Sequence, residues 1–241
     1  MMSGVDDFAA FCPLTLTTDV VGDRWTPLIL REMVLGNTRF NDIARALPGL
    51  SRSVLTQRLK HLERKGVAET WPSPSGRGNT YHLTPAGKDL EPILYTMGQW
   101  SIRWMYDHLD PGEVDAESLM WWMHRRVDPA ALPTERVTVQ FDHTAPRRCS
   151  YWMVFERAAA SVCMADPGFP VGAIVTTSTD QLGRVFSGFD TWRSAVRAGR
   201  IEVSGRREVV SGLPNWFQWS PWSTDVRDHA AAVRAPSRPS S

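Results

Sequence analysis

Residues 51–67, SRSVLTQRLKHLERKGV, run directly into residues 68–84, AETWPSPSGRGNTYHLT. The first segment is basic, and at 100° per residue its apolar residues fall on one side of a helix: Leu55, Leu59 and Leu62. Polar and charged residues fall near the opposite side: Ser53, Gln57, Lys60 and Arg64. The segment therefore predicts a helix with one face for a core and one face of hydrogen-bond donors.

The limits of this helix also follow from the sequence. Ser51, after Pro48 and Gly49, is a suitable N-cap, and Gly66 is suited to the C′ position. The helix would span about 15 residues, or about 22 Å, a length that suits a DNA major groove. The alternative is a solvated surface helix whose basic residues only complement the negative end of the helix dipole: Lys60, Arg64 and Lys65.

The second segment predicts a short hairpin with a turn rich in Pro, Ser and Gly. Arg77 lies between Gly76 and Gly78, so the backbone can bend and present the guanidinium to a minor groove or a phosphate. In the alternative interpretation, Arg77 is a hairpin tip without a partner.

Two further helices are expected upstream, at residues 25–35 and 39–47, and Pro48-Gly49-Leu50 would form the turn after them. Short helix, tight turn, basic helix and hairpin is the order of a winged helix-turn-helix. In that motif the basic helix enters the major groove.

Several separated motifs within residues 11–108 resemble the HxlR family of bacterial transcriptional regulators. They are Cys12-Pro13, DVVGDRWTPLILR at 19–31, RFNDI at 39–43, LPGLS at 47–51, VLTQRLKHLE at 54–63 and YHLTPAG at 81–87. The resemblance implies a homodimer that binds double-stranded DNA, with Arg77 on the wing. It also implies a set of groove-facing residues: Ser51, Arg52, Ser53, Thr56, Gln57 and Lys60.

These side chains are suited to two kinds of contact. Three can hydrogen-bond to base edges: Arg52, Gln57 and Lys60. Three more often hold phosphate oxygens: Ser51, Ser53 and Thr56. The net charge of +1 averages over unlike parts, because residues 45–78 contain seven Lys and Arg against two Glu. This local excess of positive charge predicts salt-sensitive DNA affinity.

Composition predicts a water-soluble cytoplasmic protein with no membrane partner. With 241 residues, 42% of them hydrophobic, the chain can form two cores. The acidic start lacks a secretory signal, and no apolar run reaches the length of a transmembrane helix. The three cysteines show no CxxC spacing, and the six histidines are scattered. No enzyme motif is found, so no catalytic residue, metal site or cofactor is expected.

After the hairpin, a long helix is expected from Thr84 to about His108, with a wide bulky stripe that includes Ile93, Met97 and Trp104. The resemblance implies that this helix and a helix near residues 12–21 form the dimer. Two-fold symmetry would then require a palindromic operator. Alternatively, the stripe packs only against the C-terminal domain.

The chain changes character at Asp110-Pro111-Gly112-Glu113, and residues 110–116 are interpreted as a linker between domains at 11–109 and 117–222. The second domain is expected to contain a helix at 117–127, strands at 136–142, 149–156, 160–164 and 171–177, helices at 180–187 and 191–198, a strand at 200–204 and an aromatic segment at 213–222. Residues 1–10 and 223–241 are expected to be a flexible N-terminus and a disordered tail.

Residues 117–222 resemble the SCP2-like (sterol carrier protein 2) fold. The resemblance is carried by DPG at 166–168, TDQL at 179–182, FSG at 186–188, AVRAGRI at 195–201 and Trp216-Phe217. It implies an apolar tunnel for a hydrophobic effector, and the surplus of aromatic residues is consistent with a cavity. The expected lining is Leu182, Val185, Phe186, Phe189, Trp192 and Phe217. The alternative is that these side chains form a filled core.

Cys12 has two interpretations. Some relatives with a cysteine at this place respond to oxidants, whereas a small helix-packing residue is the simpler role. The predicted fold class is α+β, a winged helix-turn-helix domain followed by an SCP2-like α/β sandwich-type domain. The predicted function is a dimeric repressor or activator modulated by a hydrophobic small molecule. The alternative is a carrier of an apolar metabolite that uses the winged helix as a dimer scaffold.

Overall fold

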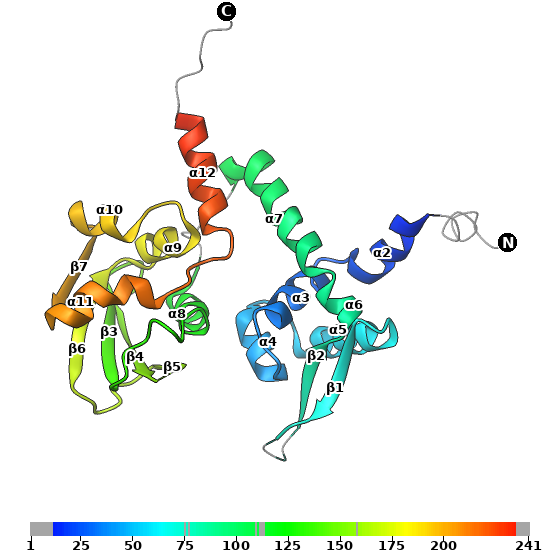
Figure 1. The fold of residues 1–241 in the computed structure, drawn as a ribbon, viewed down its shortest axis with the longest axis horizontal. Helices are drawn as coiled ribbons and strands as arrows, with labels where there is room; N and C mark the ends of the chain where they lie inside the picture. The colour runs from blue at the N-terminus through cyan, green and yellow to red at the C-terminus, as the bar shows by residue number, and fades with distance from the viewer. Residues whose placement is uncertain are drawn as a thin grey trace, which may run out of the picture. The chain divides into compact units, whose positions relative to one another are not determined.

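The computed structural model describes residues 12–74, 76, 78–108, 110, 114–157 and 159–234. The chain forms two compact units, Met1–Met97 and Gly98–Ser241, and the division falls inside helix α7 (Glu91–Trp104; Figure 1). The fold class is α+β, as the sequence predicts. Among the described residues, no helix has the length and apolar character that crossing a membrane requires.

The N-terminal unit is a winged helix-turn-helix. Its elements are α2 (Pro13–Val21), α3 (Thr26–Val34), α4 (Phe40–Ala46), α5 (Arg52–Arg64), β1 (Ala68–Pro72), β2 (Asn79–Leu83) and α6 (Pro85–Lys88). Strands β1 and β2 pair antiparallel, and Figure 1 shows this hairpin projecting away from the helices. The helices predicted around residues 25–35 and 39–47 are confirmed.

Helix α5 has the predicted limits and the predicted core face. The Ser51 hydroxyl accepts a hydrogen bond from the Val54 N–H, and Gly66 has a φ of 69° just beyond the helix. Three leucines, Leu55, Leu59 and Leu62, are at most 1% exposed. They pack with α3 and α4 side chains such as Ile29, Leu30 and Ile43. Burial of these leucines fixes how α5 is rotated about its axis.

Helix α5 is also held by polar contacts with the chain before α3. Arg58 Nε lies 3.3 Å from a carboxylate oxygen of Asp23, and Lys65 forms an ion pair with Asp19. His61 Nε2 donates to the Asp19 carbonyl oxygen at 3.0 Å. The Asp23 carboxylate accepts the N–H groups of Trp25 and Thr26 at 2.8 and 3.1 Å, so it caps α3 as well.

The expected continuous helix from Thr84 to His108 is wrong in one respect. Helix α6 ends at Lys88, α7 begins at Glu91 and ends at Trp104, and a 3-10 turn, η1 (Tyr106–His108), follows. Pro92 contributes to the interruption, because it has no N–H to donate to the Lys88 carbonyl oxygen at the end of α6.

The C-terminal unit contains a five-stranded sheet in the order β5-β4-β3-β6-β7. Its strands are β3 (Val137–His143), β4 (Cys149–Glu156), β5 (Ala159–Cys163), β6 (Val171–Thr177) and β7 (Ile201–Gly205). Strands β3 and β6 pair parallel, whereas the other neighbours pair antiparallel. The parallel pair is central, so both edges of the sheet are antiparallel strands.

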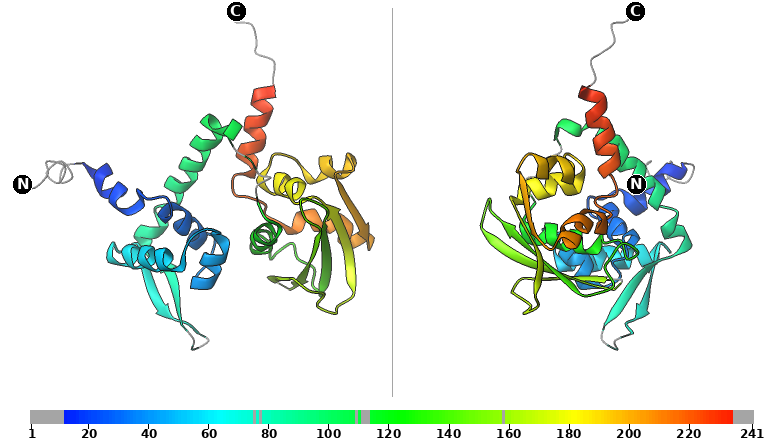
Figure 2. Two further views of the ribbon diagram at one scale, coloured as in Figure 1. Left: turned by 180° about the vertical axis from the view of Figure 1, so that it is seen from behind. Right: turned by 60° about the vertical axis from the view of Figure 1, so that its left-hand side comes forward.

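The helices of this unit cover one face of the sheet (Figure 2). They are α8 (Ala116–Arg125), α9 (Thr179–Ser187), α10 (Trp192–Arg197), α11 (Arg207–Gly212) and the 3-10 turn η3 (Leu213–Trp216). Alternate strand residues such as Val139, Phe141 and Met153 point into the resulting core and are at most 1% exposed. The opposite face is more polar, with Gln140, Asp142 and Ser150 joined by hydrogen bonds.

Two predictions for this unit were wrong. Helix α11 was not predicted, and residues from Ser223 to Arg234 form a helix, α12, instead of a disordered tail. Alanines at 230–232 have the highest helix propensity, and Val226 is buried against the unit. Tertiary burial of α12 therefore outweighs its polar composition. The expected flexible residues 1–10 and the last part of the tail, 235–241, lie outside the described residues.

The Asp23 carboxylate makes stability depend on pH. Burial acts to raise its pKa, but hydrogen bonds from Thr26 and Trp25 and the nearby Arg58 cation outweigh this and lower the pKa below its ordinary value. A lowered folded-state pKa means that the ionised form stabilises the fold. This contribution is present above the unfolded-state pKa and is lost as pH falls through the folded-state pKa.

Asp23→Asn keeps the shape of the side chain and removes its charge. We expect the free energy of unfolding of the N-terminal unit to fall by about 1 kcal/mol at neutral pH. The difference from wild type should shrink as the pH is lowered from about 5 to about 3 in urea denaturation. The control Asp89→Asn, at an exposed position, should change stability by less than about 0.5 kcal/mol. A difference that does not vary with pH would contradict this assignment.

Gly188→Ala should destabilise the C-terminal unit. Gly188 ends α9 with a φ of 93°, and an added Cβ would lie 2.2 Å from the Ser223 carbonyl oxygen. We expect a loss of about 2–3 kcal/mol in chemical denaturation. Gly199→Ala is the matched control, because its φ is 68° but no atom lies within 4 Å of the added Cβ. It should cost about 1 kcal/mol, and equal losses would show that the contact with Ser223 is unimportant.

Candidate nucleic-acid interface

The side of α5 opposite the core is exposed to solvent. All six residues predicted to face a groove are exposed: Ser51, Arg52, Ser53, Thr56, Gln57 and Lys60. Arg64, one turn beyond Lys60, is exposed as well. The helix thus presents hydroxyl, amide and cationic donors on one face, as its spacing predicts.

Arg52 is held in place by α4. Its guanidinium donates to the side-chain oxygen of Asn41, and its Cζ lies 5.2 Å from the centre of the Phe40 ring. A cation over an aromatic ring is stabilised by the quadrupole of the ring. Both contacts come from the first helix of the helix-turn-helix, so they restrict the rotamers of Arg52 while leaving it exposed. Sequence analysis named Arg52 but missed Asn41 and Phe40 as its neighbours.

The hydroxyl groups at the start of α5 bond mostly within the helix. Thr56 Oγ1 donates to the Arg52 carbonyl oxygen at 2.9 Å, and the hydroxyls of Ser51 and Ser53 are 3.0 Å apart. Together with the first N–H groups of α5, they form a polar N-terminal end of the helix that is suited to a phosphate.

The basic residues of α5 divide into two groups. Arg58 and Lys65 pair with Asp23 and Asp19. The pKa of Asp19 is lowered by its hydrogen bond and charge interaction with Lys65. Sequence analysis counted all these cations together, because pairs separated by more than 30 residues cannot be read from local spacing. The structure thus separates cations that attach the helix to the unit from those on its outer face.

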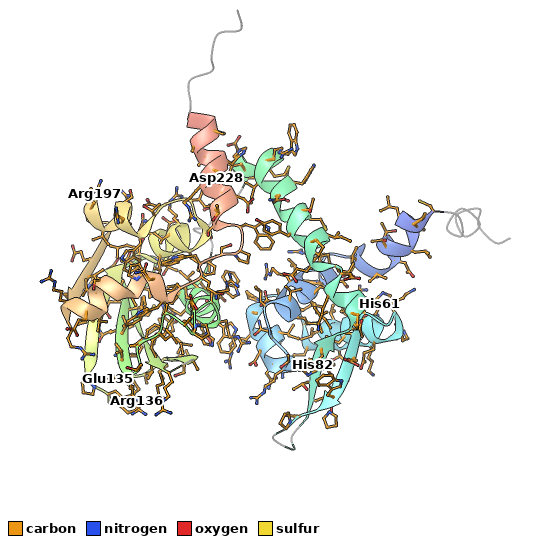
Figure 3. All side chains as sticks on the ribbon, viewed as in Figure 1. His61, His82, Glu135, Arg136, Arg197 and Asp228 are labelled. Carbon is orange, nitrogen blue, oxygen red and sulfur yellow. The ribbon has the colours of Figure 1, made fainter. Side chains whose placement is uncertain are left out.

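The wing carries an exposed aromatic pair. Trp71 on β1 and His82 on β2 stack with ring centres 4.0 Å apart, and Trp71 is 50% exposed. Figure 3 shows His82 on the hairpin and His61 on α5. The two strands place Trp71 opposite Thr80. Arg77, predicted at the wing tip, lies outside the described residues.

Helix α7 presents an exposed apolar stripe. Ile93, Met97, Trp100 and Trp104 recur at three- and four-residue steps and are 44–67% exposed. On α2, Leu14 and Leu16 are also exposed. Large apolar side chains gathered on one helix face are unusual on a monomer surface.

The predicted ligand-binding residues occupy different environments. Leu182, Val185, Phe186 and Phe217 are buried in the core of the C-terminal unit, and Trp192 packs at its edge. Phe189 lines an apolar cavity of about 310 Å³ in the same unit. The lining role of these six residues stays a prediction.

Cys12 is the residue before α2, and hydrogen bonds from the backbone of Thr15 and Leu14 lower the pKa of its thiol. Among the described residues, no group of three or more His, Cys, Asp or Glu side chains is placed to hold a metal ion.

Residues 20–109 match the family model of the HxlR-like helix-turn-helix. The HTH-type transcriptional regulator YvaP of Bacillus subtilis (strain 168) is 38% identical over 106 residues, which are 43% of this chain and 94% of YvaP. YdeP of the same organism, also an HTH-type transcriptional regulator, is 33% identical over 44% of this chain and 81% of its own length.

Among solved structures, the redox regulator HypR in its oxidized form is 33% identical, with a TM-score of 0.35 over 37% of this chain and 94% of HypR. The family model ends at residue 109, so the SCP2-like interpretation of residues 117–222 stays a prediction. The family match covers the wing and helix α5, which carries the exposed donor face. Through this N-terminal region, the chain belongs to the HxlR-like helix-turn-helix family.

Proposed function

We propose that the protein is a transcriptional regulator that binds a palindromic operator as a homodimer, with α5 of each subunit in a major groove. The observation that carries this proposal is the exposed donor face of α5, with Arg52 oriented by Asn41 and Phe40. The names of the relatives, which are HTH-type transcriptional regulators, support it. DNA binding would place the protein in the cytoplasm of a bacterium.

The donor face contains chemistry for both parts of DNA recognition. Arg52, Gln57 and Lys60 can reach base edges, where a good bidentate contact contributes about 1–3 kcal/mol of discrimination. Serine and threonine hydroxyls at the start of α5 suit phosphate oxygens and would set the register of the helix along the groove. Arg77 is proposed to contact a phosphate or the minor groove from the wing.

The ion pairs of α5 indicate which of its cations are available to DNA. Because Arg58 and Lys65 already have carboxylate partners, the cations proposed for DNA are Arg52, Lys60 and Arg64. Each phosphate contact from such a side chain contributes a slope of about −0.9 to the dependence of log affinity on log salt concentration. Salt dependence should therefore respond to a change at any of these three residues that contacts a phosphate.

Dimerisation is proposed through the exposed apolar faces of α2 and α7. A second copy would remove Trp100 and Trp104 from water, and buried tryptophans commonly contribute strongly to binding energy. A dyad between the subunits would present two α5 helices to successive major grooves on one side of the duplex.

The C-terminal unit is proposed to be an SCP2-like module that senses a hydrophobic effector. If the free energy of effector binding differs by about 1–3 kcal/mol between the DNA-bound and the unbound protein, the effector would change operator affinity 5- to 150-fold. An oxidant-sensing role for Cys12 stays a prediction, and the lowered pKa of its thiol is consistent with it.

Arg52→Ala should separate specific from non-specific binding. We expect it to weaken binding to a fragment from upstream of the protein's own coding sequence by about 5- to 150-fold, because a base contact is lost. Binding to unrelated DNA should weaken much less. Gel shifts over a salt series measure both affinities.

The matched control is Arg197→Ala, which removes one exposed cation from α10 of the C-terminal unit (Figure 3). It should leave both affinities unchanged. Equal losses on both DNAs for Arg52→Ala would mean that Arg52 contacts only phosphate. A wild-type protein that shifts neither DNA would favour the alternative of a carrier for an apolar metabolite.

Replacing Trp100 and Trp104 together by serine should dissociate the dimer. We expect the dimer dissociation constant to rise by at least about 30-fold in analytical ultracentrifugation, since two buried anchors are lost. Trp71→Ser removes a tryptophan that is 50% exposed on the wing and should leave the dimer intact. A dimer that persists in the double variant would place the interface elsewhere.

A further inference from the structure

The cavity that Phe189 lines lies beside the C-terminal half of α7. Gly98 and Ile102 of α7 form one side, and Trp222 and Val226 form another. All of its lining residues belong to the unit that begins at Gly98. Its volume of about 310 Å³ is at the small end of the range for ligand sites.

Two glycines hold the walls of this cavity close together. A Cβ at Gly98 would lie 2.2 Å from the Trp222 indole nitrogen, so the indole rests directly on the backbone of α7. A Cβ at Gly188 would meet the Ser223 carbonyl oxygen at the same distance. A glycine inside a helix costs about 1 kcal/mol relative to alanine. The close contact at Gly98 offsets that cost and fixes Trp222 at the cavity wall.

The remaining walls are also fixed by contacts. The Phe189 ring stacks on Tyr106 with ring centres 5.3 Å apart, and the Arg184 guanidinium lies 5.6 Å from the same ring. The Ser220 N–H donates to the Phe186 carbonyl oxygen at 3.0 Å, and Gln99 donates to Asp225 at 2.8 Å. The cavity therefore exists between elements that are already held together, as a preformed ligand site requires.

We propose that this cavity binds a small uncharged aromatic compound. The rings of Phe189 and Trp222 line the cavity and offer edges for T-shaped contacts with a ligand ring, because Tyr106 and Arg184 already lie against the Phe189 ring. Ser101, Ser187 and Ser220 also line the cavity. None of the described lining residues is Lys, Arg or His, and Asp110 adds a carboxylate. Arg184 contacts the Phe189 ring but does not line the cavity, whereas the Asp110 carboxylate at the wall would repel an anionic ligand.

The cavity borders α7, the helix proposed to form the dimer. Gly98, Ser101 and Ile102 face the cavity, whereas Trp100 and Trp104 belong to the exposed stripe, about 120° away around the helix. A ligand would thus contact the helix proposed for dimerisation without occupying its dimer face. This regulatory meaning rests on the proposed function, but ligand binding itself does not.

The site can be tested with 2-naphthol as probe and the full chain labelled with 5-fluorotryptophan. The chain has 11 tryptophans, and the fluorine resonance of Trp222 is assigned by its loss in Trp222→Phe. We expect 2-naphthol to shift the Trp222 resonance saturably and to leave that of Trp71 on the wing unchanged. Shifts at Trp100 and Trp104 with Trp222 unmoved would overturn the proposal, because the probe would then lie on the exposed stripe.

Ser187→Phe would fill the cavity and should weaken 2-naphthol binding at least about tenfold. The matched control Ser211→Phe adds the same ring to an exposed position on α11 and should keep wild-type affinity. Unchanged binding in a folded Ser187→Phe protein would overturn the site. If that variant does not fold, the Trp222 shift in the wild-type protein still decides the question.

The ligand class is tested by replacing 2-naphthol with 2-naphthoate, which has the same rings and a negative charge. We expect affinity at least about tenfold weaker, and equal affinities would overturn the assignment to uncharged compounds. These titrations contain no DNA. If the protein does not bind operator but shows the Trp222 shift, the proposed function is rejected and the ligand site is retained. If it binds operator but shows no Trp222 shift, the ligand site is rejected and the proposed function is retained.

Discussion

The burial of Leu55, Leu59 and Leu62 is the constraint on which the N-terminal unit depends. Three leucines on one side of α5 can leave water only if that side faces α3 and α4, so the rotation of the helix is set by apolar burial. The donor face then points outward as a consequence. Two ion pairs, Asp19 with Lys65 and Asp23 with Arg58, further restrict the rotation of α5. The outward direction of the donor face is thus set by contacts within the N-terminal unit.

The C-terminal unit is organised around a sheet with one buried face. One face of its sheet is buried under helices and the other is more polar. Apolar and polar residues alternate along the strands, as is common in sheets with antiparallel pairs. The aromatic residues concentrate on the covered face, where Phe155 packs edge-on against Trp216 with ring centres 4.9 Å apart. Most of the surplus aromatic surface is used in this core. The space that remains lies at the margin of the unit, where glycines let the segment before α12 approach α7 and α9.

Helix α7 has a role in both units, since it begins in one and ends in the other. Leu94 packs into the winged-helix core, and one or two turns later Gly98, Ser101 and Ile102 border the cavity on the same side of the helix. The exposed tryptophans lie on another face.

The sequence by itself determined the helix-turn-helix, its wing, the two faces of α5 and the five described strands of the second unit, because these depend on local periodicity, caps and turn residues. Only the tertiary structure decided which cations of α5 are paired, that Asn41 and Phe40 orient Arg52, and that residues after Ser223 form a helix. It also located a cavity beside Gly98 that is lined by Phe189, one of the six residues expected to line a ligand site. These features depend on contacts between residues far apart in the chain, and local sequence patterns contain no information on which distant side chains meet.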